Sequence, residues 1–222
     1  MAAAVLYLFD LDGTLMTSEG CGRRAFDRAC REVLGIERAL DGVILHGNTD
    51  PLILAEACAR GLDRPPSVAE AVAVIERYLA CLDEELSRPG AVTVLPAVVA
   101  LLDRLAGRGS LIGLATGNVE GGARRKLQAA GLWERFAFGG FGSDASERAR
   151  LIEVAIGRAE QRVGRAIARQ AVMVIGDTPR DIDAARAVGV RAVGVATGIH
   201  DAAILWAAGA DEVHATLATF AP

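Results

Sequence analysis

The chain has 222 residues, of which 52% are hydrophobic and 23% are charged, and its net charge at pH 7 is −4. This composition argues against disorder and allows one domain, or a core domain with a smaller insert. Because no basic excess exists to neutralise phosphates, a general nucleic-acid binder is excluded.

The four cysteines, Cys21, Cys30, Cys58 and Cys81, form no C-x-x-C pair. We therefore expect free thiols in a reducing compartment. The first residues lack the basic start of a signal peptide, and no run of about 18 apolar residues could span a membrane. We expect a cytoplasmic protein, a monomer or small homo-oligomer, with neither a membrane nor a nucleic acid as partner.

Short apolar runs alternate with stretches of helical periodicity along most of the chain. Strands are expected at 5–9, 111–115, 171–175 and 191–196, with a weaker one at 211–214. Helices are expected at 96–105, 122–130, 150–163 and 181–188. The alternation predicts an α/β fold with a Rossmann-like, doubly wound parallel sheet.

The segment between the first two strands is far longer than a simple crossover requires. It has helical periodicity, with helices expected at 23–34, 51–60 and 67–86. We therefore predict an α-helical cap at 18–88, inserted into a core formed by 1–17 and 89–222. Glycines at 20 and 22 and the Pro89-Gly90 pair are candidate hinges.

Polar residues follow three of the predicted strands. The first strand is followed by Asp10 and Asp12, the second by Thr116, Gly117 and Asn118, and the third by Gly176, Asp177, Thr178 and Asp181. A single aspartate after a strand is more often a turn or capping residue. Because the carboxyl ends of parallel strands share one edge, three such endings favour a functional site.

Four carboxylates at one edge would repel each other unless a cation lay among them. Oxygen ligands without imidazole or thiolate favour Mg²⁺, which commonly bridges to a phosphate oxygen. Backbone N–H groups around Gly13 and after Thr116 could bind the other phosphate oxygens. The residues therefore indicate phosphoryl chemistry.

These motifs resemble those of the haloacid dehalogenase superfamily, in its phosphoglycolate phosphatase-like group with a helical cap. The residues Asp10–Thr14 match D-x-D-G-T, Thr116–Asn118 match the hydroxyl motif, and Gly176–Asp181 match G-D-x-x-x-D. The resemblance implies a Mg²⁺-dependent phosphatase that acts on a small phosphorylated metabolite through an aspartyl-phosphate. Phosphoglycolate is the default substrate.

The resemblance also implies the role of each matching residue. Asp10 would be the nucleophile, and Asp12 the general acid and base. The implied Mg²⁺ ligands are Asp10, the backbone carbonyl of Asp12, and Asp177, with Asp181 in support. The phosphoryl group would be bound at Thr116 and Gly117, in a site that also includes Gly13, Thr14 and Asn118.

The catalytic cation of the family is normally a lysine, and this is where the sequence departs from the pattern. The only lysine is Lys126, on a predicted helix that carries it roughly 15 Å from the strand end, so we expect it to face solvent. Arg148, just before the helix that leads to the third strand, is the better candidate, with Arg150 close by. Arginine is not equivalent to lysine in such a role.

Cap residues are expected to select the substrate. Arg23 or Arg24 could reach an anionic leaving group, with Arg24 the chosen candidate, and His46 or Asn48 could enter the cleft. Asp50 is expected to cap the helix that follows it.

Three alternatives stay open. A phosphomutase of the β-phosphoglucomutase type would use the same aspartyl-phosphate. A 2-haloacid dehalogenase is disfavoured because Asp12, Gly13 and Thr14 are all present. A regulatory or binding protein on a degenerate core is disfavoured by the intact Asp10, Asp12, Thr116 and Asp177.

Overall fold

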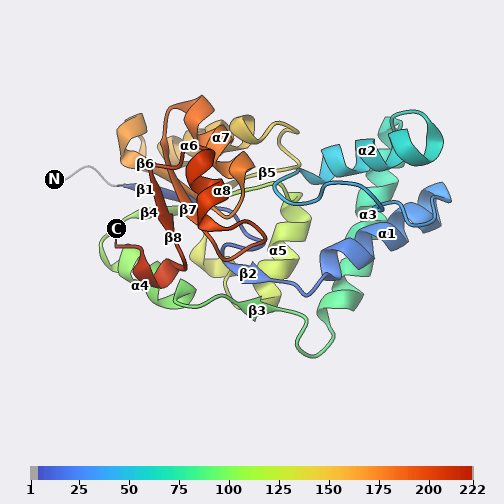
Figure 1. Cartoon of the computed structure of the whole chain (residues 1–222), viewed down its shortest axis with the longest axis horizontal. Coiled ribbons are helices and arrows are strands. Elements are labelled where there is room, and N and C mark those ends of the chain that lie inside the picture. The colour runs from blue at the N-terminus through green and yellow to red at the C-terminus, as the bar shows by residue number, and fades with distance from the viewer. Residues whose placement is uncertain (1–4, 222) are drawn as a thin grey trace.

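The computed structural model describes residues 5–221 and contains a six-stranded parallel sheet in the order β5-β4-β1-β6-β7-β8 (Figure 1). The strands are β1 (Leu6–Phe9), β4 (Leu111–Thr116), β5 (Gly139–Phe141), β6 (Val172–Gly176), β7 (Arg191–Val195) and β8 (Glu212–His214). The helices of this core are α4 (Val98–Gly107), α5 (Glu120–Ala129), α6 (Arg148–Val163), α7 (Pro179–Val188) and α8 (Ala202–Ala207). The predicted doubly wound fold is confirmed.

The central strand β1 is buried on both faces, and its side chains alternate between two hydrophobic clusters. Tyr7 and Phe9 pack with residues of α4 and α5, whereas Leu6 and Leu8 pack with residues of α6 and α7. This is the two-residue period of a strand covered by helices on both sides. Burial on both faces fixes the register of β1, and so fixes where Asp10 emerges at its end.

A helical cap lies beside one end of the sheet and is formed by α1 (Cys21–Leu34), α2 (Asp50–Leu62) and α3 (Val68–Leu86) (Figure 1). It has a hydrophobic cluster of its own, in which the rings of Phe26 and Tyr78 lie 5.0 Å apart. The four cysteines belong to this cluster and are free and buried.

Two short strands connect the cap with the core. β2 (Met16–Thr17) pairs antiparallel with β3 (Thr93–Val94), so the chain enters and leaves the cap along adjacent paths. The predicted domain limits at residues 18 and 88 fall between these strands and the cap helices. Each strand has two residues, too few for a hydrophobic period, so neither can be predicted from the sequence.

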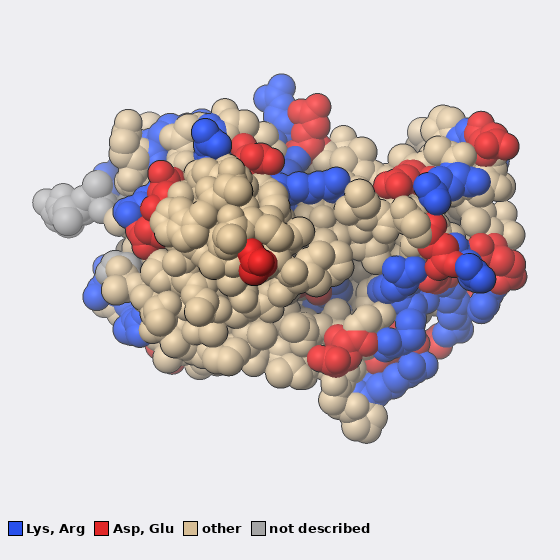
Figure 2. Space-filling view, viewed as in Figure 1, with Lys and Arg blue, Asp and Glu red and all other residues tan. Residues whose placement is uncertain are grey.

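Basic and acidic side chains are interleaved over the cap on the face seen in Figure 2. Many of them pair, as Arg28 does with Glu32 and Glu84. No helix within residues 5–221 is long and apolar enough to cross a membrane.

The edge strand β5 was not expected from the sequence, because it is short and contains two glycines. Helix α6 packs so closely on it that a Cβ added to Gly140 would overlap the carbonyl oxygen of Leu151. By contrast, a Cβ added to Gly157, within α6, would meet no atom within 4 Å.

Gly140→Ala and Gly157→Ala should therefore change stability in opposite directions. We expect the first to lower the free energy of unfolding by about 1–3 kcal/mol through overpacking. The second should raise it by about 0.5–1 kcal/mol, because alanine is the better helix former. Urea denaturation measures both, and shifts of the same sign would contradict the close packing of α6 on β5.

Candidate active site

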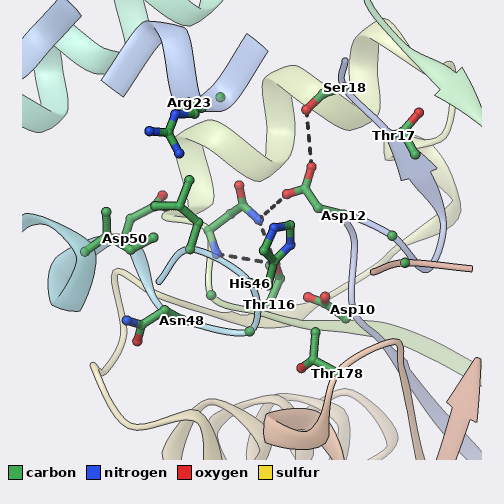
Figure 3. Close-up of a pocket in the computed structure, with 18 of the residues that line it drawn as sticks. Asp10, Asp12, Thr17, Ser18, Arg23, His46, Asn48, Asp50, Thr116 and Thr178 are labelled. Atoms are coloured by element: carbon green, nitrogen blue, oxygen red, sulfur yellow. Dashed lines mark hydrogen bonds between the residues drawn. The ribbon is translucent and has the colours of Figure 1, made fainter. Parts of the chain in front are cut away.

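A cavity of about 490 Å³ lies between the carboxyl edge of the sheet and the cap. Figure 3 shows residues from both sides of it, with Arg23 and Asp50 of the cap facing Asp10, Asp12 and Thr116 of the core. The cap wall is partly apolar and includes Phe26, Leu40, Leu45, Ile53 and Tyr78. Except for Asp181, the polar side chains predicted after three strands thus line a single cavity.

Asp10 lies directly after β1, and its backbone N–H donates to the carbonyl oxygen of Ile175 on β6 (2.9 Å). Its carboxylate forms an ion pair with Arg148 (2.8 Å), the first residue of α6. Arg148 also pairs with Asp181 (2.5 Å). The guanidinium is therefore the cation next to Asp10, whereas Arg150 is exposed and lies outside this cluster.

Three buried carboxylates form a group that could hold a metal ion. One oxygen each from Asp10, Asp177 and Asp181 lies within 4.8 Å of the others. Asp181 is largely committed elsewhere, because it binds Arg148 and also accepts hydrogen bonds from the N–H and hydroxyl of Thr178. Asp10 and Asp177 are thus the freer carboxylate ligands.

Asp177 is held at the centre of the site by close backbone packing. The hydroxyl of Thr14 donates to it (3.1 Å), and a Cβ added to Gly13 or to Gly198 would overlap its carboxylate. Gly198 belongs to the loop after β7, which also bonds to Gly13 through the hydroxyl of Thr197 (2.6 Å). The sequence motifs do not predict a role for this loop, although Thr197-Gly198 lies just after β7 as Thr116-Gly117 lies at the end of β4.

The pKa values of Asp10 and Asp177 indicate that Arg148 alone does not balance the negative charge around them. Burial raises the pKa of Asp177 to about 8, and the charges of Asp10 and Asp181 add to the shift. Burial also raises the pKa of Asp10 to about 6, against the attraction of Arg148. A divalent cation bound by oxygen ligands would relieve this repulsion, so the donor set fits Mg²⁺.

Asp12 points away from this group and toward the cap. Its carboxylate accepts hydrogen bonds from Lys126 (2.6 Å) and from the side-chain amide of Asn118 (2.9 Å). Ser18 donates to its other oxygen (3.4 Å; Figure 3). Burial would raise the pKa of Asp12, but the attraction of Lys126 and the hydrogen bonds of Lys126, Asn118 and Ser18 together lower it.

The expectation that Lys126 faces solvent is therefore wrong. This residue is only 5% exposed, and its ammonium group also donates to the amide oxygen of Asn118 (2.8 Å). Helix α5 begins at Glu120, two residues earlier than expected. Lys126 therefore lies only about 9 Å from the start of the helix, measured along its axis. Helical side chains also lean toward the helix N-terminus, which returns the ammonium group to the sheet edge.

The turn after β4 holds its own polar groups in place. The fully buried hydroxyl of Thr116 accepts hydrogen bonds from the backbone N–H (3.3 Å) and the side chain (2.9 Å) of Asn118. The carbonyl of Asn118 accepts from Gly142 (2.8 Å). Thr116, Gly117 and Asn118 thus form an ordered wall beside Asp10.

Of the candidate cap residues, the structure places Arg24 outside the cavity and the others in its lining. Arg24 does not line the cavity, because its side chain turns outward to Glu85 (2.6 Å) and to the carbonyl of Glu19 (2.7 Å). Its neighbour Arg23 does line it, as do His46 and Asn48.

Contrary to the prediction, Asp50 does not cap helix α2. The residue at the N-cap of α2 is Thr49, and the carboxylate of Asp50 accepts a hydrogen bond from Val119 of the core instead (2.8 Å). Burial raises the pKa of Asp50 to about 6, although Lys126 and the Val119 bond oppose the shift.

The doubly wound fold with its cap, together with the carboxylates and cations at the sheet edge, is that of an enzyme that transfers phosphoryl groups. The sequence model of the haloacid dehalogenase-like hydrolases matches residues 7–195, so the chain belongs to this family. The resemblance seen in the motifs is thereby confirmed.

The relatives identify the class of reaction. A probable phosphatase, IndB, of Dickeya dadantii (strain 3937) is 32% identical over 198 residues, which are 88% of this chain and 82% of that protein. A phosphoglycolate phosphatase of Synechococcus elongatus (strain ATCC 33912) is 31% identical over 118 residues, 53% of each chain. The protein is thus a phosphatase, a phosphoric monoester hydrolase.

A solved structure agrees in fold along almost the whole chain. It is described as a predicted phosphoglycolate phosphatase from Haemophilus somnus 129PT, with a TM-score of 0.73 and 19% identity. The match covers 98% of this chain and 96% of that one.

Asp177→Asn should change how the stability of the metal-free protein depends on pH. A carboxyl whose pKa is raised on folding, here from 3.8 to about 8, contributes stability at low pH that is lost as the pH rises through 8. We therefore expect the free energy of unfolding of the variant, relative to that of the wild type, to increase as the pH rises from about 5 to about 8.5. The increase should be several kcal/mol, at about 1.4 kcal/mol per pKa unit.

Thermal unfolding in a chelating buffer tests this expectation. Added Mg²⁺ should raise the Tm of the wild type at pH 8 and have little effect on the variant. A constant difference between the two proteins across this pH range would contradict the assignment of the raised pKa to Asp177.

Lys126→Met should lower kcat by about 10–100-fold, because Asp12 loses the cation that orients it and holds its charge. Arg125→Met is the matched control, since Arg125 adjoins Lys126 in sequence but pairs with Asp83 on the surface. We expect the control to stay within about twofold of the wild type. Phosphate release from any accepted substrate measures both, and equal activity of the two variants would contradict a role for Lys126.

Proposed function

We propose that this phosphatase is Mg²⁺-dependent and hydrolyses a small phosphorylated metabolite through an aspartyl-phosphate on Asp10. One arrangement carries the proposal. The carboxylate of Asp10 has Arg148 and the acidic group on one side, while Asp12, held by Lys126, faces the cap side of the cavity. This arrangement supplies a nucleophile, a charge-balancing cation and a separate proton carrier.

In the first step a carboxylate oxygen of Asp10 attacks phosphorus, and the bond from phosphorus to the leaving alcohol oxygen breaks. Asp12 gives the leaving oxygen its proton. As a proton donor, Asp12 must be protonated when the substrate is bound. The dianionic phosphate of the substrate favours that form, since a neighbouring negative charge raises the pKa of a carboxyl group. Thr116, the amide of Gly117 and Arg148 would hold the phosphoryl oxygens.

In the second step Asp12 takes a proton from a water molecule, whose oxygen attacks the phosphorus of the aspartyl-phosphate. The bond between phosphorus and the carboxylate breaks, which regenerates Asp10 and releases inorganic phosphate. The lowered pKa of Asp12 keeps it ionised for this role as a base.

Mg²⁺ would be held by Asp10, by Asp177 and by the backbone carbonyl of Asp12, with Asp181 in support. Bound there, it would neutralise the phosphate oxygens and the acidic group. Arg148 spans Asp10 and Asp181 and so fixes the nucleophile beside this position.

Phosphoglycolate is the first substrate to test, because one relative is named a phosphoglycolate phosphatase and Arg23 faces the cavity. The cavity volume of about 490 Å³ and its apolar cap wall also admit larger phosphomonoesters. A panel of phosphorylated metabolites is therefore the right measurement.

Across that panel, the wild type should release phosphate only when Mg²⁺ is present. Asp10→Asn should lower the rate by at least about 10³-fold, since the amide is no nucleophile. The folded state of the variant is checked by its thermal unfolding. Equal release by wild type and Asp10→Asn, or equal rates with Mg²⁺ and with a chelator, would overturn the corresponding part of the proposal.

A further inference from the structure

A short cap segment, Gly47–Asp50, lies directly on the core turn that follows β4. The backbone N–H of Asp50 donates to the carbonyl of Gly117 (2.8 Å). In return, the backbone N–H of Val119 donates to the carboxylate of Asp50 (2.8 Å). Asp50 therefore holds this turn at two points, one on each side of Asn118.

The contact is made at backbone distance. A Cβ added to Gly117 would overlap the carbonyl oxygen of Asn48, so the cap segment occupies the place that a side chain would take. The hydroxyl of Thr49, which is buried, donates to the carbonyl of Ser146 (3.0 Å) and so ties the segment to the core just before α6 as well. Small movements of the segment would thus be transmitted to the turn.

The charge of Asp50 interacts with groups of the core. Its carboxylate lies at the N-terminal end of α5, where the helix dipole favours negative charge, and Lys126 of the same helix attracts it. Only 7% of the residue is exposed. An aspartate that begins the cap helix α2 thus makes its hydrogen bonds to the core.

We propose that Asp50 is a positioning residue, through which the cap orients the phosphate-binding turn Thr116–Asn118. The inference rests on the proposed function, in which the amide of Gly117 binds a phosphoryl oxygen. With its carbonyl held by Asp50, the peptide on the other side of Gly117 keeps a fixed direction toward Asp10. The cap therefore contributes to catalysis as well as closing the cavity.

The test compares Asp50→Ala, Asp50→Asn and the control Asp83→Ala. Asp83 also joins the cap to the core, through Arg125 on α5 (2.8 Å), but its contact is exposed and does not touch the turn. For each variant we measure kcat with an accepted substrate, the inhibition constant of inorganic phosphate, and Tm. Assays are run far below the lowest Tm.

We expect Asp50→Ala to lower kcat about 10–100-fold and to raise the inhibition constant of phosphate about tenfold. Asp50→Asn keeps an oxygen for Val119 and should recover most of both losses. Asp83→Ala should stay within about twofold of the wild type. A merely structural Asp50 would lower Tm and leave the phosphate inhibition constant of the folded enzyme unchanged, which would overturn the proposal.

Val119→Pro removes the same hydrogen bond from the core side and serves if Asp50→Ala fails to fold. The backbone angle φ of Val119 is −60°, which proline adopts. We expect the same weakening of phosphate inhibition, and an unchanged inhibition constant would overturn the proposal. A wild type that releases no phosphate from any ester would instead overturn the proposed function, so the two failures are distinct.

Discussion

The site depends on the balance of charge at the carboxyl edge of the sheet. Asp10, Asp177 and Asp181 are buried within a few ångströms of each other, and Arg148 is the only cation in direct contact with them among the described residues. One guanidinium cannot balance three carboxylates, so burial and mutual repulsion raise the pKa values of Asp10 and Asp177. The same imbalance makes the edge attractive to a divalent ion and, through it, to phosphate.

A second and separate balance governs Asp12. Its partner is Lys126, from α5 and not from α6. Both Lys126 and Asn118 donate hydrogen bonds to Asp12, and Lys126 also donates to Asn118, on the cap side of the cavity. The two neighbouring acids of the first motif thus have different cations, one an arginine and one a lysine. Their pKa values shift in opposite directions, because burial and the neighbouring Asp181 raise that of Asp10 against the pull of Arg148, whereas Lys126 and hydrogen bonds lower that of Asp12.

Much of this could be read from the sequence, because it depends on local patterns. The apolar run before Asp10 predicts a buried strand, and parallel strands bring their polar ends to one edge. Lys126 and Asp50 could not be placed in this way. The position of Lys126 depends on where α5 begins and on the direction of a long side chain, and Asp50 acts on a turn distant in the sequence.

The paired strands β2 and β3 bring the two ends of the cap together at one place on the core. An insertion with adjacent ends can be exchanged for another of different length or shape while the sheet keeps its order. Such modularity would let substrate preference diverge while the chemistry of Asp10 and Asp12 stays constant. The bonds of Asp50 to Gly117 and Val119 limit that freedom, since any replacement cap must also present an acceptor and a donor to the same turn.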